Sequence, residues 1–154
     1  MTLHTRRELL AHSAAVAGLM AGAGLWPAAA WANWPAPAFE AKSMAAVMKA
    51  LGTAAPVESK DVTLSGPEIA ENGSVVPLAV ATTLPGVKRL LVLIEKNPAT
   101  LAAIFEVSDA IEPAFQTRVK MGQSSNVYAV AVMADGRVLF AQKDIKVTLG
   151  GCGG

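Results

Sequence analysis

The sequence contains a single cysteine, Cys152, and only two histidines, His4 and His12. One cysteine cannot form an intramolecular disulfide, and it excludes zinc and iron–sulfur sites built from cysteines alone. Basic residues nearly balance acidic ones, 13 lysines and arginines against 12 aspartates and glutamates. Because phosphate binding needs clustered lysine and arginine, this composition does not predict a nucleic-acid-binding protein.

The first 32 residues have the pattern of an export signal. Arg6 and Arg7 precede a glycine-diluted apolar run that ends on Ala30-Trp31-Ala32, a small-x-small cleavage pattern. Paired arginines before such a run resemble a twin-arginine signal, which exports folded proteins. We expect cleavage before Asn33, a periplasmic protein, and no membrane attachment after cleavage.

An uncleaved membrane anchor is the alternative for this segment. Residues 9–32 are long enough to span a bilayer. The glycines, Pro27 and the cleavage pattern favour a cleaved signal instead.

The predicted mature chain, residues 33–154, contains no histidine. A catalytic Ser–His or Cys–His pair, an imidazole metal ligand and a histidine-ligated haem therefore cannot be built from this chain alone. We expect no bound metal and no cofactor. The one group that we expect the chain to hold is a covalent adduct on Cys152.

One short helix is expected near the start of the mature chain. Pro35-Ala36-Pro37 provides a stiff entry, since proline is tolerated in the first turn of a helix. An apolar stripe with helical spacing follows at Met44, Val47, Met48 and Leu51, and Gly52 is a suitable stop.

The rest of the chain predicts short strands separated by turn residues, and Asp135-Gly136 is a strong hairpin signal. The expected strands are 57–64, 74–81, 89–95, 101–107, 114–121, 126–133, 137–142 and 145–149. This number of short strands indicates an all-β, immunoglobulin-like antiparallel β-sandwich. The continuous apolar run Leu90–Ile94 predicts either a central strand covered on both faces or a face given to another subunit.

The sequence closes on Gly150-Gly151-Cys152-Gly153-Gly154. Glycine offers no side chain to pack and loses much conformational entropy on ordering, so we expect a flexible arm that exposes the thiol. An accidental free thiol and a disulfide-linked homodimer are simple interpretations. A covalent carrier, whose thiol is presented to the active sites of other proteins, is the third.

Several segments together resemble the SoxY family, the sulfur-carrying subunits of the bacterial thiosulfate-oxidising Sox system. The most specific is Gly150–Gly154 after Lys146-Val147-Thr148. The others are 67–73 (PEIAENG) with 75–77 (VVP), 95–98 (EKNP) before Phe105, and 117–120 (TRVK). The twin-arginine signal also suits this family.

The resemblance implies a fold, a site and partners. It implies an immunoglobulin-like sandwich that forms a heterodimer with a SoxZ-like subunit. It further implies that Cys152 carries substrate sulfur covalently, with Gly150, Gly151, Gly153 and Gly154 as the arm. A haem enzyme would conjugate thiosulfate to the thiol, a hydrolase would remove sulfate, and a dehydrogenase is a further candidate partner.

The sequence thus predicts a signal over residues 1–32, a SoxY-like domain over 33–149 and a carrier arm over 150–154. We expect a periplasmic sulfur carrier that is not itself an enzyme. The alternatives are a structural or chaperone-like β-sandwich crosslinked through its tail cysteine and an electron-transfer accessory protein.

Overall fold

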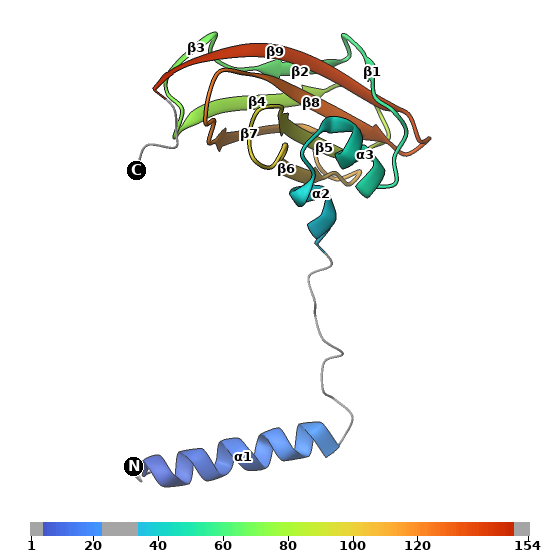
Figure 1. The fold of residues 1–154 in the computed structure, drawn as a ribbon. Helices are drawn as coiled ribbons and strands as arrows, with labels where there is room; N and C mark the ends of the chain where they lie inside the picture. The colour runs from blue at the N-terminus through green and yellow to red at the C-terminus, as the bar shows by residue number, and fades with distance from the viewer. Residues whose placement is uncertain (1–4, 23–33, 150–154) are drawn as a thin grey trace. The chain divides into compact units, whose positions relative to one another are not determined.

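The computed structural model describes residues 5–22 and 34–149, and the chain divides into two units, Met1–Trp34 and Pro35–Gly154 (Figure 1). Helix α1 (Arg6–Gly22) lies in the first unit. No helix among the described residues is both long and apolar enough to cross a membrane. The expected cleavage pattern, residues 30–32, lies outside the described residues.

The second unit is a sandwich of two β-sheets, which confirms the predicted all-β architecture. The larger sheet has the order β1-β9-β8-β5-β6, with β3 also paired to β9, and the smaller sheet has the order β2-β4-β7. The strands are β1 (Val57–Glu58), β2 (Val62–Ser65), β3 (Ile69–Asn72), β4 (Val76–Thr82), β5 (Val87–Ile94), β6 (Leu101–Glu106), β7 (Ala114–Val119), β8 (Ser125–Met133) and β9 (Val138–Leu149).

The boundaries and the pairing of the strands differ from the prediction in three respects. The predicted strand 57–64 is two strands, because Ser59 and Asp61 form a hydrogen-bonded turn between β1 and β2. The predicted strands 137–142 and 145–149 are one continuous strand, β9. The sandwich is not entirely antiparallel, because β1 and the unpredicted β3 both pair with β9 in parallel.

The hairpin between β8 and β9 forms as predicted. Gly136 has a φ of +89°, a conformation that glycine adopts without steric cost. Met133 N–H donates to the Arg137 carbonyl at 2.9 Å, and Arg137 N–H donates to Asp135 Oδ1 at 3.0 Å. The Asp135 carboxylate also accepts from Arg137 Nε at 2.7 Å. These contacts with Arg137 lower the pKa of Asp135.

Two short helices precede the strands, where the sequence predicted one. The predicted helix is α3 (Met44–Ala50), capped by Ser43, whose Oγ accepts from Ala46 N–H at 3.2 Å. Gly52 follows it with a φ of +66°, as expected of a glycine that ends a helix. The entry around Pro35 forms a helix of its own, α2 (Ala36–Glu40).

Strand β5 is covered on both faces by this chain itself. Leu90, Val92 and Ile94 point into the core between the two sheets. Leu91 and Leu93 pack in a second core on the opposite face, together with Val47 and Met48 of α3. The alternative interpretation of this run, a face left for another subunit, is therefore wrong for β5.

Candidate functional site

The predicted carrier arm, residues 150–154 with Cys152 and its four glycines, lies outside the described residues. The structure shows where the arm begins, which is the last residues of β9. On one side this segment pairs in parallel with β3, so that Asn72 lies opposite Leu149. Thr148 Oγ1 donates to the Glu71 carbonyl at 2.9 Å, and Lys146 N–H donates to the Glu68 carbonyl at 2.9 Å.

The β7–β8 loop holds the end of β9 from a second direction. Ser124 Oγ accepts a hydrogen bond from Val147 N–H at 2.9 Å and lies 3.5 Å from the Val147 carbonyl, to which it donates. One hydroxyl thus satisfies both backbone groups of Val147. Because β3 and Ser124 both contact this segment, the arm begins from an anchored strand rather than from a frayed end.

Three of the motif segments identified in the sequence meet at this end of the sandwich. Met121 N–H donates to the Gly73 carbonyl at 2.7 Å, which joins the end of β7 to the turn after β3. Asn97 Nδ2 donates to the Lys120 carbonyl at 2.7 Å, and Asn97 Oδ1 accepts from Gly122 N–H at 3.2 Å. The segments around Asn72-Gly73, Asn97-Pro98 and 117–120 therefore form one hydrogen-bonded platform, the arm-side loops.

The Asn72-Gly73 turn has a wider role than the sequence suggested. Asn72 Oδ1 accepts from Ser74 N–H at 2.8 Å, as expected of an Asx turn. The same residue also ends β3 beside Leu149. The Asn-Gly pair thus shapes the turn and places the strand that flanks the arm.

Glu95 lies in the loop between β5 and β6 and contacts the only tyrosine of the chain. Its Oε2 accepts from Asn126 Nδ2 at 3.0 Å and lies 3.5 Å from Tyr128 Oη. Partial burial raises the pKa of Tyr128 above its ordinary value of 10.0, and the negative charge of Glu95 raises it further. Tyr128 is therefore a neutral hydrogen-bond donor near neutral pH.

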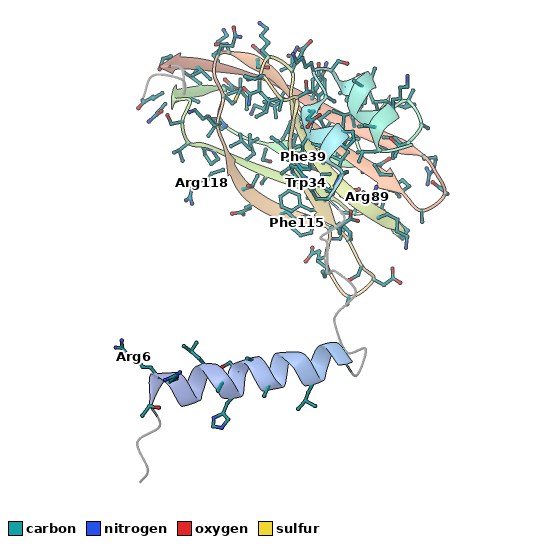
Figure 2. All side chains as sticks on the ribbon, turned by 60° about the horizontal axis from the view of Figure 1, so that its bottom comes forward. Arg6, Trp34, Phe39, Arg89, Phe115 and Arg118 are labelled. Atoms are coloured by element: carbon teal, nitrogen blue, oxygen red, sulfur yellow. The ribbon has the colours of Figure 1, made fainter. Side chains whose placement is uncertain are left out.

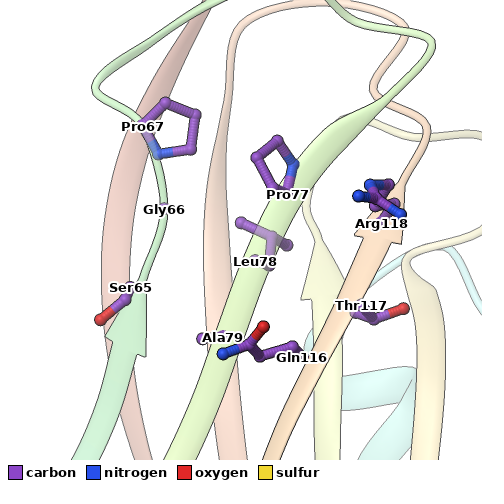
Figure 3. A pocket seen from close by; sticks show the side chains of 9 residues that line it. All are labelled: Ser65, Gly66, Pro67, Pro77, Leu78, Ala79, Gln116, Thr117 and Arg118. Atoms are coloured by element: carbon purple, nitrogen blue, oxygen red, sulfur yellow. The ribbon is translucent and has the colours of Figure 1, made fainter.

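The outer face of the smaller sheet carries a hollow of about 580 Å³ that the sequence did not predict (Figure 3). It lies between Gly66-Pro67, the β4 residues Pro77–Ala79 and the β7 residues Gln116–Arg118. Arg118 is the one ionisable side chain among its lining residues. No local pattern marks this hollow, because three separate strands contribute to it.

No group of three or more histidine, cysteine, aspartate or glutamate side chains suited to a metal ion occurs in residues 5–22 and 34–149. Arg6 and Arg7, the predicted export residues, lie exposed at the start of α1. Figure 2 shows Arg6 there. What the site provides is a fixed origin for residues 150–154.

Comparison with known proteins identifies relatives of this fold. A family model described as sulfur oxidation protein SoxY matches residues 47–152. The structure of the sulfur carrier protein SoxY from Chlorobium limicola f thiosulfatophilum is similar, with 30% sequence identity and a TM-score of 0.61 over 68% of this chain and 94% of that chain. No curated protein sequence matches this chain.

Two superoxide reductases show the fold alone. A variant of the neelaredoxin from Ignicoccus hospitalis is 18% identical with a TM-score of 0.51, covering 56% of this chain and 78% of that chain. A putative superoxide reductase from Thermotoga maritima is 15% identical with a TM-score of 0.51, covering 60% of this chain and 93% of that chain.

Proposed function

The chain belongs to the SoxY family, and we propose that it is a sulfur carrier of sulfur oxidation that holds substrate sulfur covalently on Cys152. The observation that carries this proposal is the extent of the family match, which runs from residue 47 to residue 152 and so includes the cysteine. Cys152 is also the only thiol in the sequence.

The first chemical step joins thiosulfate to the thiol. Cys152 loses its proton to solvent, and its sulfur forms an S–S bond with the outer sulfur of thiosulfate. Joining a thiolate and thiosulfate in this way releases two electrons, which a haem enzyme of the Sox system accepts. The thiolate is the reactive form of cysteine, and its ordinary pKa is about 8.5, so the partner's active site supplies the activation.

The second step releases sulfate without a net change in electrons. Water attacks the sulfonate sulfur, the bond between the two thiosulfate-derived sulfurs breaks, and sulfate leaves with the oxygen from water. A persulfide stays on Cys152, and a hydrolase catalyses this reaction. A dehydrogenase for the remaining sulfane sulfur is a further partner of the same system. The carrier itself catalyses none of these steps.

The hydrogen bonds around β9 support a carrier role. A carrier needs a thiol on a tether that can enter clefts, and it needs a domain that stays folded while the tether moves. Glycine provides a thin tether that accepts unusual backbone dihedral angles. Ser124 and β3 anchor the strand from which the tether begins. From Leu149, three residues of extended chain reach roughly 10 Å to Cys152.

We further propose a periplasmic location and a heterodimer with a SoxZ-like subunit. The Arg6-Arg7 pair and the cleavage pattern at residues 30–32 support export of the folded protein. The heterodimer rests on the family alone, because both faces of β5 are covered by this chain and leave no apolar face there for a partner.

The intact mass of the protein purified from cells grown on thiosulfate tests the function. The proposal predicts adducts of sulfur or sulfonate units that reductant removes and that are absent from Cys152→Ser. A protein found only as free thiol and disulfide-linked dimer would instead support the crosslinked structural sandwich.

A further inference from the structure

Strand β7 presents a regular free edge of the smaller sheet. It pairs with β4 through six consecutive residue pairs, from Val76 with Val119 to Ala81 with Ala114, without a register shift. It has no second hydrogen-bonded neighbour among the described strands, although Phe115 stacks on Phe105 of β6 with ring centroids 4.6 Å apart. In an antiparallel pair, alternate residues direct their backbone N–H and C=O groups away from the partner strand, so this edge offers a row of hydrogen-bonding groups.

Strands β6, β2 and β1, which also lie at sheet edges, are less suited to pairing. In β6, Val92 pairs with Ala103 but Leu93 pairs with Leu101, so Ala102 bulges out of the ladder. The residue before β6, Thr100, donates its N–H to the Ala41 carbonyl. Strand β2 has four residues and leads into Gly66, whose carbonyl accepts from Lys143 Nζ at 2.6 Å. Strand β1 has only two residues.

An amide side chain already occupies the continuation of the β7 edge. Asn97 offers its Nδ2 to the Lys120 carbonyl and its Oδ1 to Gly122 N–H, as a peptide group of a neighbouring strand would. On the other side of the same segment, Met121 N–H bonds to Gly73 of the β3–β4 turn. Asn97 therefore marks where an added strand would stop. At the other end Ala114 N–H already donates to the Glu112 carbonyl at 2.8 Å, so the available groups run from the Ala114 carbonyl to Arg118.

Positive charge lies beside this edge. Arg118 and Lys120 are both exposed, and residues 113–122 contain no acidic side chain. Neither side chain forms a hydrogen bond or ion pair with the described part of the chain. A hollow of about 440 Å³ lies between the end of β7 and the residues around Pro98 and Leu101, and Arg118 and Lys120 are the only charged residues that line it. Figure 2 shows Arg118 projecting from the molecule, and Figure 3 shows it on β7 beside β4.

From this edge and its charge we propose that β7 binds an extended acidic segment of a partner protein by strand addition. Backbone hydrogen bonds to residues 114–118 would supply affinity, and carboxylates facing Arg118 and Lys120 would select the segment. A second copy of this chain is disfavoured as the occupant, because it would bring two edges of the same positive charge together. This interaction does not depend on the sulfur chemistry of Cys152.

Peptide titration of the ¹⁵N-labelled mature protein, followed by NMR, tests the proposal. The probes are two acetylated octapeptides, one alternating valine and glutamate and one alternating valine and lysine. We expect the glutamate peptide to shift the amide signals of residues 114–120 and the lysine peptide to bind at least tenfold more weakly. Arg118→Glu, which leaves Lys120 in place, should abolish this preference, whereas Lys60→Glu, an equal charge change in the turn before β2, should preserve it.

Three outcomes would overturn the proposal. One is no shift at millimolar peptide, and another is equal binding of the two peptides. The third is a concentration-dependent dimer of the chain alone whose contacts map to residues 114–119, which would make a second copy the occupant. Retention of the dispersed amide spectrum in both variants shows that the comparison concerns folded protein.

Discussion

Asn97 Nδ2 donates a 2.7 Å hydrogen bond to the carbonyl of Lys120, although the two residues are 23 positions apart and lie in different loops. The same side chain accepts from Gly122 N–H. One amide thus joins the β5–β6 loop to the β7–β8 loop, and the latter supplies Ser124 to the last residues of β9. The polar side chains of Asn97 and Ser124 thus connect these loops to their neighbours, and Met121 of the same β7–β8 loop is fully buried in the core between the sheets.

Replacing Asn97 should loosen this end of the sandwich. Asn97→Ala removes two hydrogen bonds and leaves the Lys120 carbonyl and Gly122 N–H without their partner. We expect a loss of about 1–2 kcal/mol in the free energy of unfolding, measured by urea denaturation. Gln123→Ala is the matched control, because Gln123 is exposed and forms no side-chain hydrogen bond with the described residues. An equal loss in both variants would contradict the role given to Asn97.

The contact between Glu95 and Tyr128 predicts a measurable pH dependence. Tyr128 is the only tyrosine, so ultraviolet absorbance reports its titration directly. Its pKa lies above 10.0, so folding favours the neutral phenol, and the associated stability is present below pH 10 and falls as the pH rises through the folded pKa. Glu95→Gln should lower the pKa towards 10. An unchanged titration curve in that variant would show that Glu95 has no influence.

The two cores around β5 should both matter in the isolated chain. Leu90 and Leu91 are fully buried on opposite faces of the strand. Leu90→Ala and Leu91→Ala should each lower the free energy of unfolding by about 2–5 kcal/mol. Val57→Ala, at a side chain that is 63% exposed, should change it by less than about 0.5 kcal/mol. If Leu91→Ala left the free energy of unfolding unchanged, the second core, which Leu91 forms with α3, would need another subunit to form.

Export should depend on the arginine pair. Replacing Arg6 and Arg7 together by lysine should leave precursor in the cytoplasm, because the twin-arginine route recognises the pair itself. Fractionation and N-terminal sequencing measure this, and Arg137→Lys serves as the control for the same chemical change outside the signal. Normal delivery of the double variant, or a periplasmic protein that still begins before Arg6, would contradict the predicted route.

The strands could be predicted largely from local patterns, because alternation and turn residues are local properties. The Asp135-Gly136 hairpin and the α3 stripe that ends at Gly52 are clear examples. Strand β3 could not be predicted in this way, because only Ala70 among its side chains is buried and its partner β9 lies more than 70 residues later. The parallel pairing of β1 with β9 could not be predicted for the same reason, because Val57 pairs with Leu139, which lies 82 residues later.

The candidate site, too, could be predicted only in part from the sequence. Cys152 and its glycines are recognisable from composition alone. The groups that hold the beginning of the arm are not, because Ser124 and Val147 are 23 positions apart and no local pattern relates them. The free edge of β7 likewise depends on sheet order, since its sequence resembles that of any half-buried strand.

Thiosulfate-dependent turnover by the reconstituted carrier and its partner enzymes tests the central claim most directly. The assay compares the wild-type chain with Cys152→Ser, which keeps the size of the side chain but removes the sulfur that must form the S–S bond. We expect complete loss of turnover in Cys152→Ser, with unchanged melting temperature. Turnover at the wild-type rate in Cys152→Ser would contradict the covalent carrier mechanism.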